Sequence, residues 1–189
     1  MNYTYDVLNR LSAGGVWLPL LVSFAAATPA TDVPKGWHEF VSEKGGYVAY
    51  YPGSWHVLEP SPPTLHICSF RPSESLTAVI VPDRGATIGV VPPPAGVTSI
   101  AQWITRDGAA TPVPSEKSFT LPRPEPNPPL RVTEVAFEQI EGPGTVSWYF
   151  DLSGRLLVAR LSYWNGEPNV ARFRQVLRDI VRIIAPLPR

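Results

Sequence analysis

The side chains best suited to metal binding in this sequence are three histidines, His38, His56 and His66. None of them falls in the H-x-x-H or H-E-x-x-H spacing of known zinc motifs. His56 and His66 flank residues 59–64, so a hairpin there would bring the two imidazoles toward one metal ion, with Glu59 nearby. The other interpretation is that both are surface residues at strand ends, and the sequence leaves the two open.

Cys68 is the only cysteine, so a disulfide within the chain is impossible. It follows Ile67 in an apolar segment, which favours a small buried side chain. His66 lies two residues away on the same face, where it would be the base for a reactive thiolate. The sequence has no G-x-S-x-G motif and no glycine-rich phosphate loop. No catalytic residue is therefore predicted, and the enzyme class left open is a small envelope hydrolase using His56, His66 or Cys68.

Charged side chains are balanced over the chain, with 16 Lys and Arg against 16 Asp and Glu. No overall field would attract nucleic acid, so no nucleic-acid partner is expected. From residue 155 onward, seven arginines face only two acids, Glu167 and Asp179. One interpretation is a solvated helix face, and the other is a docking surface for an anionic partner or a membrane surface. Alternation along their strand predicts that Glu134 and Glu138 lie on a solvated face.

Most tryptophans are expected in the core. Trp164 differs because it lies at a strand end beside Asn165 and Gly166, where an exposed ring would be able to bind a ligand. The candidates for ligand binding are Trp55, Trp164 and Arg160, and the ligand itself is unknown. No cofactor is predicted.

Residues 1–30 have the pattern of a secretory signal. Arg10 precedes an apolar run over residues 14–27 that is too short to cross a bilayer. Small residues allow cleavage after Ala27 or Ala30, and no cysteine follows the run, which argues against a lipoprotein. A retained anchor or a disordered tail is the alternative. We therefore expect a secreted or periplasmic protein, with one domain over residues 31–189 and no transmembrane span in the mature chain.

Prolines and glycines divide this domain into segments of strand length. Proline, 23 of 189 residues, fixes φ and lacks a backbone donor, so its clusters mark loops, including a proline-rich loop around residues 112–129. Alternating and β-branched segments between the turns predict strands. These cover residues 37–42, 47–51, 55–58, 65–70, 77–81, 86–91, 116–121, 130–140, 145–151 and 155–164.

Two helices are predicted from apolar spacing. Ser99 is the expected N-cap of a short helix that ends at Gly108. A longer helix is expected to have Pro168 in its first turn, where proline is tolerated, and to stop at Pro186. Its apolar stripe consists of Val170, Phe173, Leu177, Ile180 and Ile184. We expect this stripe to cover a sheet that presents Trp148 and Phe150 on one side.

The opening hairpin carries a resemblance to a known family. A short apolar strand, a glycine turn, an aromatic strand ending in Tyr-Pro and a following tryptophan are similar to the start of PsbP-like domains, a group that includes the Mog-like Ran-binding proteins. The matching residues are Phe40, Gly46, Tyr47, Tyr51, Pro52 and Trp55. The resemblance extends over residues 37–184 through the order of the later elements.

The resemblance implies an α+β fold, a mainly antiparallel β-sheet with helices packed on it in a PsbP/Mog-like α-β-α sandwich. It also implies an accessory or binding module of a larger extracytoplasmic assembly. The expected function is thus a non-catalytic secreted or periplasmic protein that binds a protein partner in the cell envelope. The alternatives are the small hydrolase and a metal-binding protein that uses His56 and His66.

Overall fold

The computed structural model describes residues 32–58, 64–72, 85–108, 115–137 and 143–188. The strands in these ranges are β1 (Trp37–Ser42), β2 (Tyr47–Pro52), β3 (His56–Val57), β4 (Leu65–Cys68), β5 (Ala86–Val91), β6 (Ser115–Leu121), β7 (Leu130–Phe137), β8 (Pro143–Asp151), β9 (Leu156–Trp164) and β10 (Ala185–Pro186). The helices are α1 (Ile100–Gly108) and α2 (Val170–Ile183).

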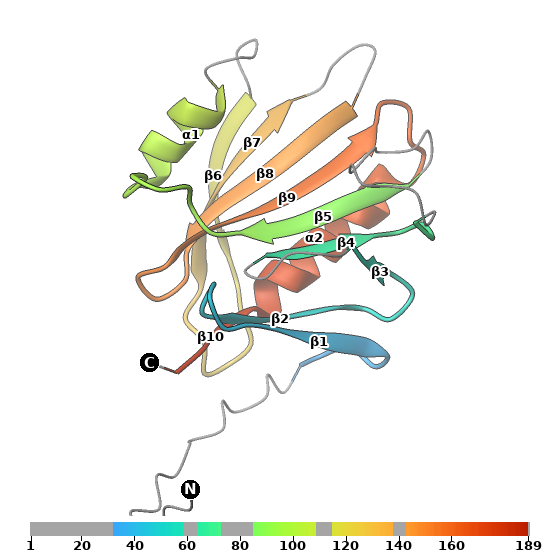
Figure 1. Cartoon of the computed structure of the whole chain (residues 1–189), viewed down its shortest axis with the longest axis horizontal. Coiled ribbons are helices and arrows are strands. Elements are labelled where there is room, and N and C mark those ends of the chain that lie inside the picture. The colour runs from blue at the N-terminus through green and yellow to red at the C-terminus, as the bar shows by residue number, and fades with distance from the viewer. Residues whose placement is uncertain (1–31, 59–63, 73–84, 109–114, 138–142, 189) are drawn as a thin grey trace, which may run out of the picture.

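All strand pairs are antiparallel, and they form two sheets (Figure 1). The large sheet has seven strands in the order β3-β4-β5-β9-β8-β7-β6. The small sheet has three strands in the order β1-β2-β10. Helices pack on the sheets, so the predicted α+β class is confirmed.

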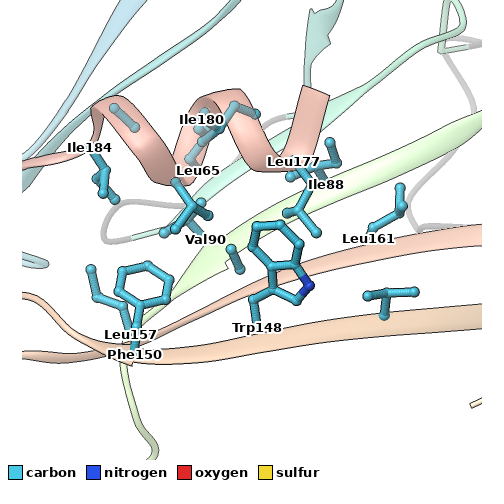
Figure 2. Close-up of a cluster of buried hydrophobic side chains, with 14 of the residues drawn as sticks. Leu65, Ile88, Val90, Trp148, Phe150, Leu157, Leu161, Leu177, Ile180 and Ile184 are labelled. Carbon is cyan, nitrogen blue, oxygen red and sulfur yellow. The ribbon is translucent and has the colours of Figure 1, made fainter. Parts of the chain in front are cut away.

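One face of the large sheet is covered by α2. Residues at alternate positions of each strand point to this face, as the two-residue period of a strand requires. Leu177 and Ile180 of the helix meet Trp148, Phe150 and other side chains of the sheet, all of them buried (Figure 2). This is the stripe and the sheet face that the sequence predicted. The first residue after the helix, Ile184, extends the same contact.

The opposite face is covered in part by α1. Ser99 caps this helix as predicted, since its Oγ accepts a hydrogen bond from Gln102 N at 3.2 Å. Trp103 is 2% exposed and packs edge-on against Tyr149 of β8, with ring centroids 5.6 Å apart. Val135 and Val158 complete this second core. The helix therefore lies over strands β7 to β9 and not over β4.

Tyr47 joins the small sheet to the large one. The side chain is fully buried, and its hydroxyl donates to Val90 O at 2.8 Å and accepts from Leu65 N at 3.0 Å. Burial raises the pKa of Tyr47 to about 12, so the hydroxyl stays neutral. Two backbone groups at the adjoining strands β4 and β5 are thus satisfied by one side chain from β2.

Strand β10 has no signal in the sequence. Pro186 ends the helical segment, as predicted, but Ala185 and Pro186 then pair with β2. A hydrogen bond of 2.9 Å from Leu187 N to Gly46 O continues the pairing. The sequence predicted a stop here and could not show that the chain returns to the first hairpin.

Some predictions fall outside the described residues. These are the signal at residues 1–30 and the strand at 77–81. Within the predicted proline-rich loop 112–129, residues 115–121 form β6, where a strand was predicted over 116–121, and 122–129 are irregular. Residues 112–114 lie outside the described residues. Neither helix in the described part of the chain is long and apolar enough to cross a membrane.

Arg123, in this irregular stretch, binds the end of α2. Its Nε donates to Arg182 O at 3.2 Å, and its Nη2 donates to Ile184 O. The last carbonyls of a helix lack intrahelical partners and carry its negative dipole end, so a guanidinium there is doubly favourable. Burial lowers the pKa of Arg123, which remains charged at neutral pH.

Replacing Arg123 by alanine is expected to destabilise the fold by about 1–3 kcal/mol, because two charge-assisted hydrogen bonds are lost and the carbonyls they satisfied are left bare. Urea unfolding of the two proteins measures this difference. Arg131→Ala removes an exposed arginine from β7 and serves as the control. Equal stability of the two variants would contradict the role of Arg123.

Candidate functional site

Glu134 on β7 is a buried carboxylate, with its side chain 7% exposed. Its Oε2 accepts a hydrogen bond of 2.7 Å from the indole of Trp148, and its Oε1 lies 3.0 Å from Lys117 Nζ and 3.5 Å from Arg174 Nη1. The prediction of a solvated Glu134 is wrong. The register places it on the face covered by α2, where neighbouring donors replace water. Glu138 lies outside the described residues.

Lys117, Arg174 and Arg178 form what we call the cationic patch. The first two contact Glu134, and the Arg178 guanidinium lies over the Trp148 ring, 5.8 Å from its centroid. This distance is within the range of a cation–π contact. The patch lies along the margin between α2 and the edge strand β6. It includes two arginines of the predicted arginine-rich segment, Arg174 and Arg178.

The charge state of Glu134 follows from these contacts. Burial by itself would raise the pKa of Glu134, but the hydrogen bonds from Lys117 and Trp148 and the positive charges of Lys117 and Arg174 outweigh it. The pKa of Glu134 is therefore below its usual value. The ionised carboxylate stabilises the folded state above the unfolded-state pKa, and this contribution is lost as the pH falls through the lower, folded-state pKa.

Glu134→Gln is expected to lower stability at pH 7 and to flatten the fall in stability below about pH 4.5, because the neutral amide does not titrate. Urea unfolding at pH 7, 5, 4 and 3 measures both effects. Glu116→Gln, an exposed acid on β6, is the matched control and should keep the wild-type pH dependence. Parallel pH curves for Glu134→Gln and the wild type would contradict the assignment.

A second polar group lies on the opposite face of the large sheet. His66 on β4, Gly89 on β5 and Arg160 on β9 are successive register partners, so their positions form one row on one face. A pocket of about 200 Å³ opens above them, at the part of the sheet that α1 does not cover. We call this the sheet-face pocket, and its lining residues are Leu58, His66, Thr87, Ile88, Gly89, Val91, Arg160 and Ser162.

The Arg160 guanidinium is held by residues from two other elements, β8 and α1. Its Nε donates to Ser147 Oγ at 2.9 Å, and its Nη2 donates to Asp107 Oδ2 at 2.5 Å. The same Asp107 oxygen accepts the Tyr149 hydroxyl at 2.7 Å. Burial, followed by the hydrogen bond and charge of Asp107, raises the pKa of Tyr149 to about 12, so the phenol stays protonated and keeps donating.

The sequence singled out Arg160 and missed these partners. Ser147, Asp107 and Tyr149 are 13, 53 and 11 positions away from it. The available signal was a charged residue in the middle of an otherwise apolar strand, since such a residue needs a polar partner from a neighbouring element. Which partner it takes depends on the pairing of strands, which periodicity does not define.

His66 lies close above Gly89. A Cβ built on Gly89 would be 2.7 Å from His66 Cδ2 and 2.9 Å from Nε2, both too short for an ordinary contact. The lack of a side chain at Gly89 therefore leaves the space that the His66 imidazole occupies. Burial lowers the pKa of His66, so the ring is neutral at neutral pH.

Gly89→Ala is expected to cost about 1–3 kcal/mol, because the added methyl forces the His66 ring to move. His66→Ala removes the ring, so the double variant should be more stable than the sum of the two single changes predicts. A double-mutant cycle by urea unfolding measures this coupling. Gly108→Ala, where a Cβ meets no atom within 4 Å, is the control. Strict additivity would contradict the proposed contact.

The predicted hairpin around residues 59–64 is present as the pairing of β3 with β4. His56 is the register partner of Cys68, and Leu58 N donates to His66 O at 2.8 Å. His56 thus lies diagonally across from His66 on the same face. Within the described ranges, no group of three or more His, Cys, Asp or Glu side chains is close enough together to hold a metal ion. The two-histidine site stays a prediction.

Cys68 is fully buried, and its thiol donates to Phe70 O at 3.0 Å. Burial raises the pKa of Cys68, which keeps it a neutral thiol. This agrees with the expected small buried side chain.

The two tryptophan candidates lie apart from the sheet-face pocket. Trp55 is 8% exposed and packs edge-on against Phe173, with ring centroids 5.8 Å apart. It also borders a hollow of about 720 Å³ between β4 and the start of α2. Trp164 is 39% exposed at the end of β9.

No protein-family model matches the chain, and no curated protein sequence matches it either. Among solved structures, it is similar to a protein from Bacteroides thetaiotaomicron, with a TM-score of 0.48 and 10% identity over 81% of this chain and 49% of that one. This chain thus spans about half the length of the Bacteroides protein.

Two further similar structures match nearly the whole of their own chains. Cyanobacterial PsbP from Synechocystis has a TM-score of 0.46 and 11% identity over 85% of this chain and 98% of that one. A protein of unknown function from Pseudomonas aeruginosa has a TM-score of 0.40 and 12% identity over 81% and 97%. The family that the sequence resembles is thus present among these structures, and the likeness concerns the fold alone.

Proposed function

We propose that this chain is a non-catalytic accessory protein, secreted or periplasmic, that binds an acidic surface of a partner protein through the cationic patch. The signal-like residues 1–30 support the location outside the cytoplasm. The carrying observation is a buried carboxylate, Glu134, that two cations contact, with a third cation over the tryptophan ring that donates to it.

Glu134 orders the patch without cancelling its charge. Its side chain is 7% exposed, whereas Lys117 is 66% exposed and Arg174 is 32% exposed. The carboxylate therefore lies beneath the cations, which face solvent. Arg178 lies over the Trp148 ring that donates to Glu134, so the patch carries three positive charges against one negative charge. Groups held in place before binding lose less conformational entropy when a partner arrives.

The patch is also accessible to a large partner. Strand β6 is the last strand of the large sheet, and its residues 115–118 are exposed. Exposed charges of this kind contribute mainly to the rate and selectivity of association, and salt weakens them. An acidic partner protein fits a surface that is cationic and confined to one margin of the sheet.

The test uses a fluorescent peptide of eight glutamates, with affinity measured by anisotropy at low and physiological salt. The wild type should bind, and Arg174→Gln/Arg178→Gln should bind about tenfold more weakly, since each lost pair is worth up to about 1 kcal/mol. Arg131→Gln/Arg172→Gln removes the same charge from two other exposed sites and should bind like the wild type.

Equal losses in the two double variants would show that only net charge matters and would overturn the proposal. Vesicles of anionic phospholipid supply a competing surface. Stronger patch-dependent binding to vesicles than to the peptide would replace the protein partner with a membrane.

A further inference from the structure

We infer that the sheet-face pocket binds a short-chain carboxylate, with the carboxylate group on Arg160 and the chain against Leu58 and Val91. This site lies on the face of the large sheet opposite the cationic patch, and it involves none of the patch residues. The inference does not depend on the proposed protein partner.

Arg160 is the group that would bind the acid. Ser147 and Asp107 occupy its Nε and Nη2, which fixes the plane of the guanidinium. Within the part of the chain that the structure describes, Nη1 makes no hydrogen bond, and Arg160 lines the pocket. An oriented guanidinium with unused donors is suited to a carboxylate oxygen.

The remaining polar lining complements a carboxylate. Thr87 and Ser162 bring hydroxyl groups, which donate to an anion at little cost in geometry because they rotate. The neutral His66 ring offers one donor nitrogen, and its place above Gly89 is set by the lack of a side chain there. These groups surround the same small space from β4, β5 and β9.

The charge of the site favours a single negative charge. Asp107 already balances part of the Arg160 charge, and in the described residues the pocket lining contains no other permanently charged side chain. A phosphate dianion would need more positive charge than this. A monoanionic carboxylate needs one donor pair and leaves the ion pair intact.

The volume of the pocket and its apolar lining residues define the length of the ligand's carbon chain. Leu58 and Val91 border the pocket, so the part of the ligand beyond the carboxylate is apolar. A volume of about 200 Å³ is that of roughly six or seven water molecules in the liquid. Butyrate, with six heavy atoms, is of this size.

The experiment is isothermal titration of the full-length protein with butyrate, butyramide and inorganic phosphate at constant ionic strength. Butyrate should bind with one-to-one stoichiometry, and butyramide, which has the same shape without the charge, should bind about tenfold or more weakly. Phosphate should not compete. Equal affinity for butyrate and butyramide, or binding of phosphate alone, would overturn the inference on the native protein without any variant.

Variants then locate the site. Arg160→Gln and Ser162→Leu should each abolish butyrate binding, the first by removing the guanidinium and the second by filling the pocket from a half-buried position. Thermal melts confirm that each variant is folded. Arg131→Gln and Arg174→Gln/Arg178→Gln should bind butyrate like the wild type. Retention of binding by both pocket variants would place the ligand elsewhere and reject this pocket.

A carboxylate has two possible sources, a free acid or the C-terminus of a protein. N-acetyl-Gly-Val, with a free carboxylate, and its C-terminal amide distinguish them. Tighter binding of the peptide acid than of butyrate identifies a protein terminus, and tighter binding of butyrate identifies a free acid. Both results support the carboxylate site, and binding of neither acid contradicts it.

Discussion

The position of the sheet-face pocket depends on one geometric mismatch, a wide sheet under a short helix. Seven strands spaced about 4.8 Å apart span roughly 29 Å, whereas the nine residues of α1 extend about 13 Å. The helix covers β7 to β9 through Trp103 and leaves the β4 side of that face without a helix. Polar residues such as Arg160 and His66 are tolerated there because water or a ligand reaches them.

The face of the large sheet under α2 is covered more completely. The fourteen residues of α2 extend about 21 Å and, with the small sheet, leave a continuous apolar core beneath them. A carboxylate on this face is tolerated only at the margin, where the long side chains of Lys117 and Arg174 reach Glu134 from the edge strand and the helix. Burial of the Glu134 carboxylate is unfavourable unless cations pair with it. The pairing cations, Lys117 and Arg174, belong to the patch.

Much of this fold was predictable from local patterns. The alternation in β8 and the apolar stripe of α2 each indicate one buried face. Gly108 and Pro186 end their elements through their own backbone geometry, which is also a local property. The strand pairing was not predictable in the same way. β5 pairs with β9 across about 70 positions, and β10 returns to β2 across about 140, and no local period carries such information.

The candidate sites follow the same division. Arg160 and the arginine-rich helix were visible because charge in an apolar strand or on a helix face is a local signal. The burial of Glu134 was not visible, because alternation gives the side of the strand but not what covers it. Asp107 was equally hidden, since its partner Arg160 comes from a strand on the far side of the proline-rich stretch.

The two sites share strand β8 as their support. Trp148 points to α2, where it donates to Glu134 and lies beneath Arg178, and the next residue, Tyr149, points to α1 and holds Asp107. Adjacent residues of a strand face opposite sides, so one segment of backbone orients both groups. Hydrogen bonding to β7 and β9 on either edge makes this segment rigid. Backbone pairing thus fixes where each site starts from, and each site's own side-chain contacts complete it on opposite faces of the sheet. Substitutions in one site are therefore expected to leave the geometry of the other unchanged.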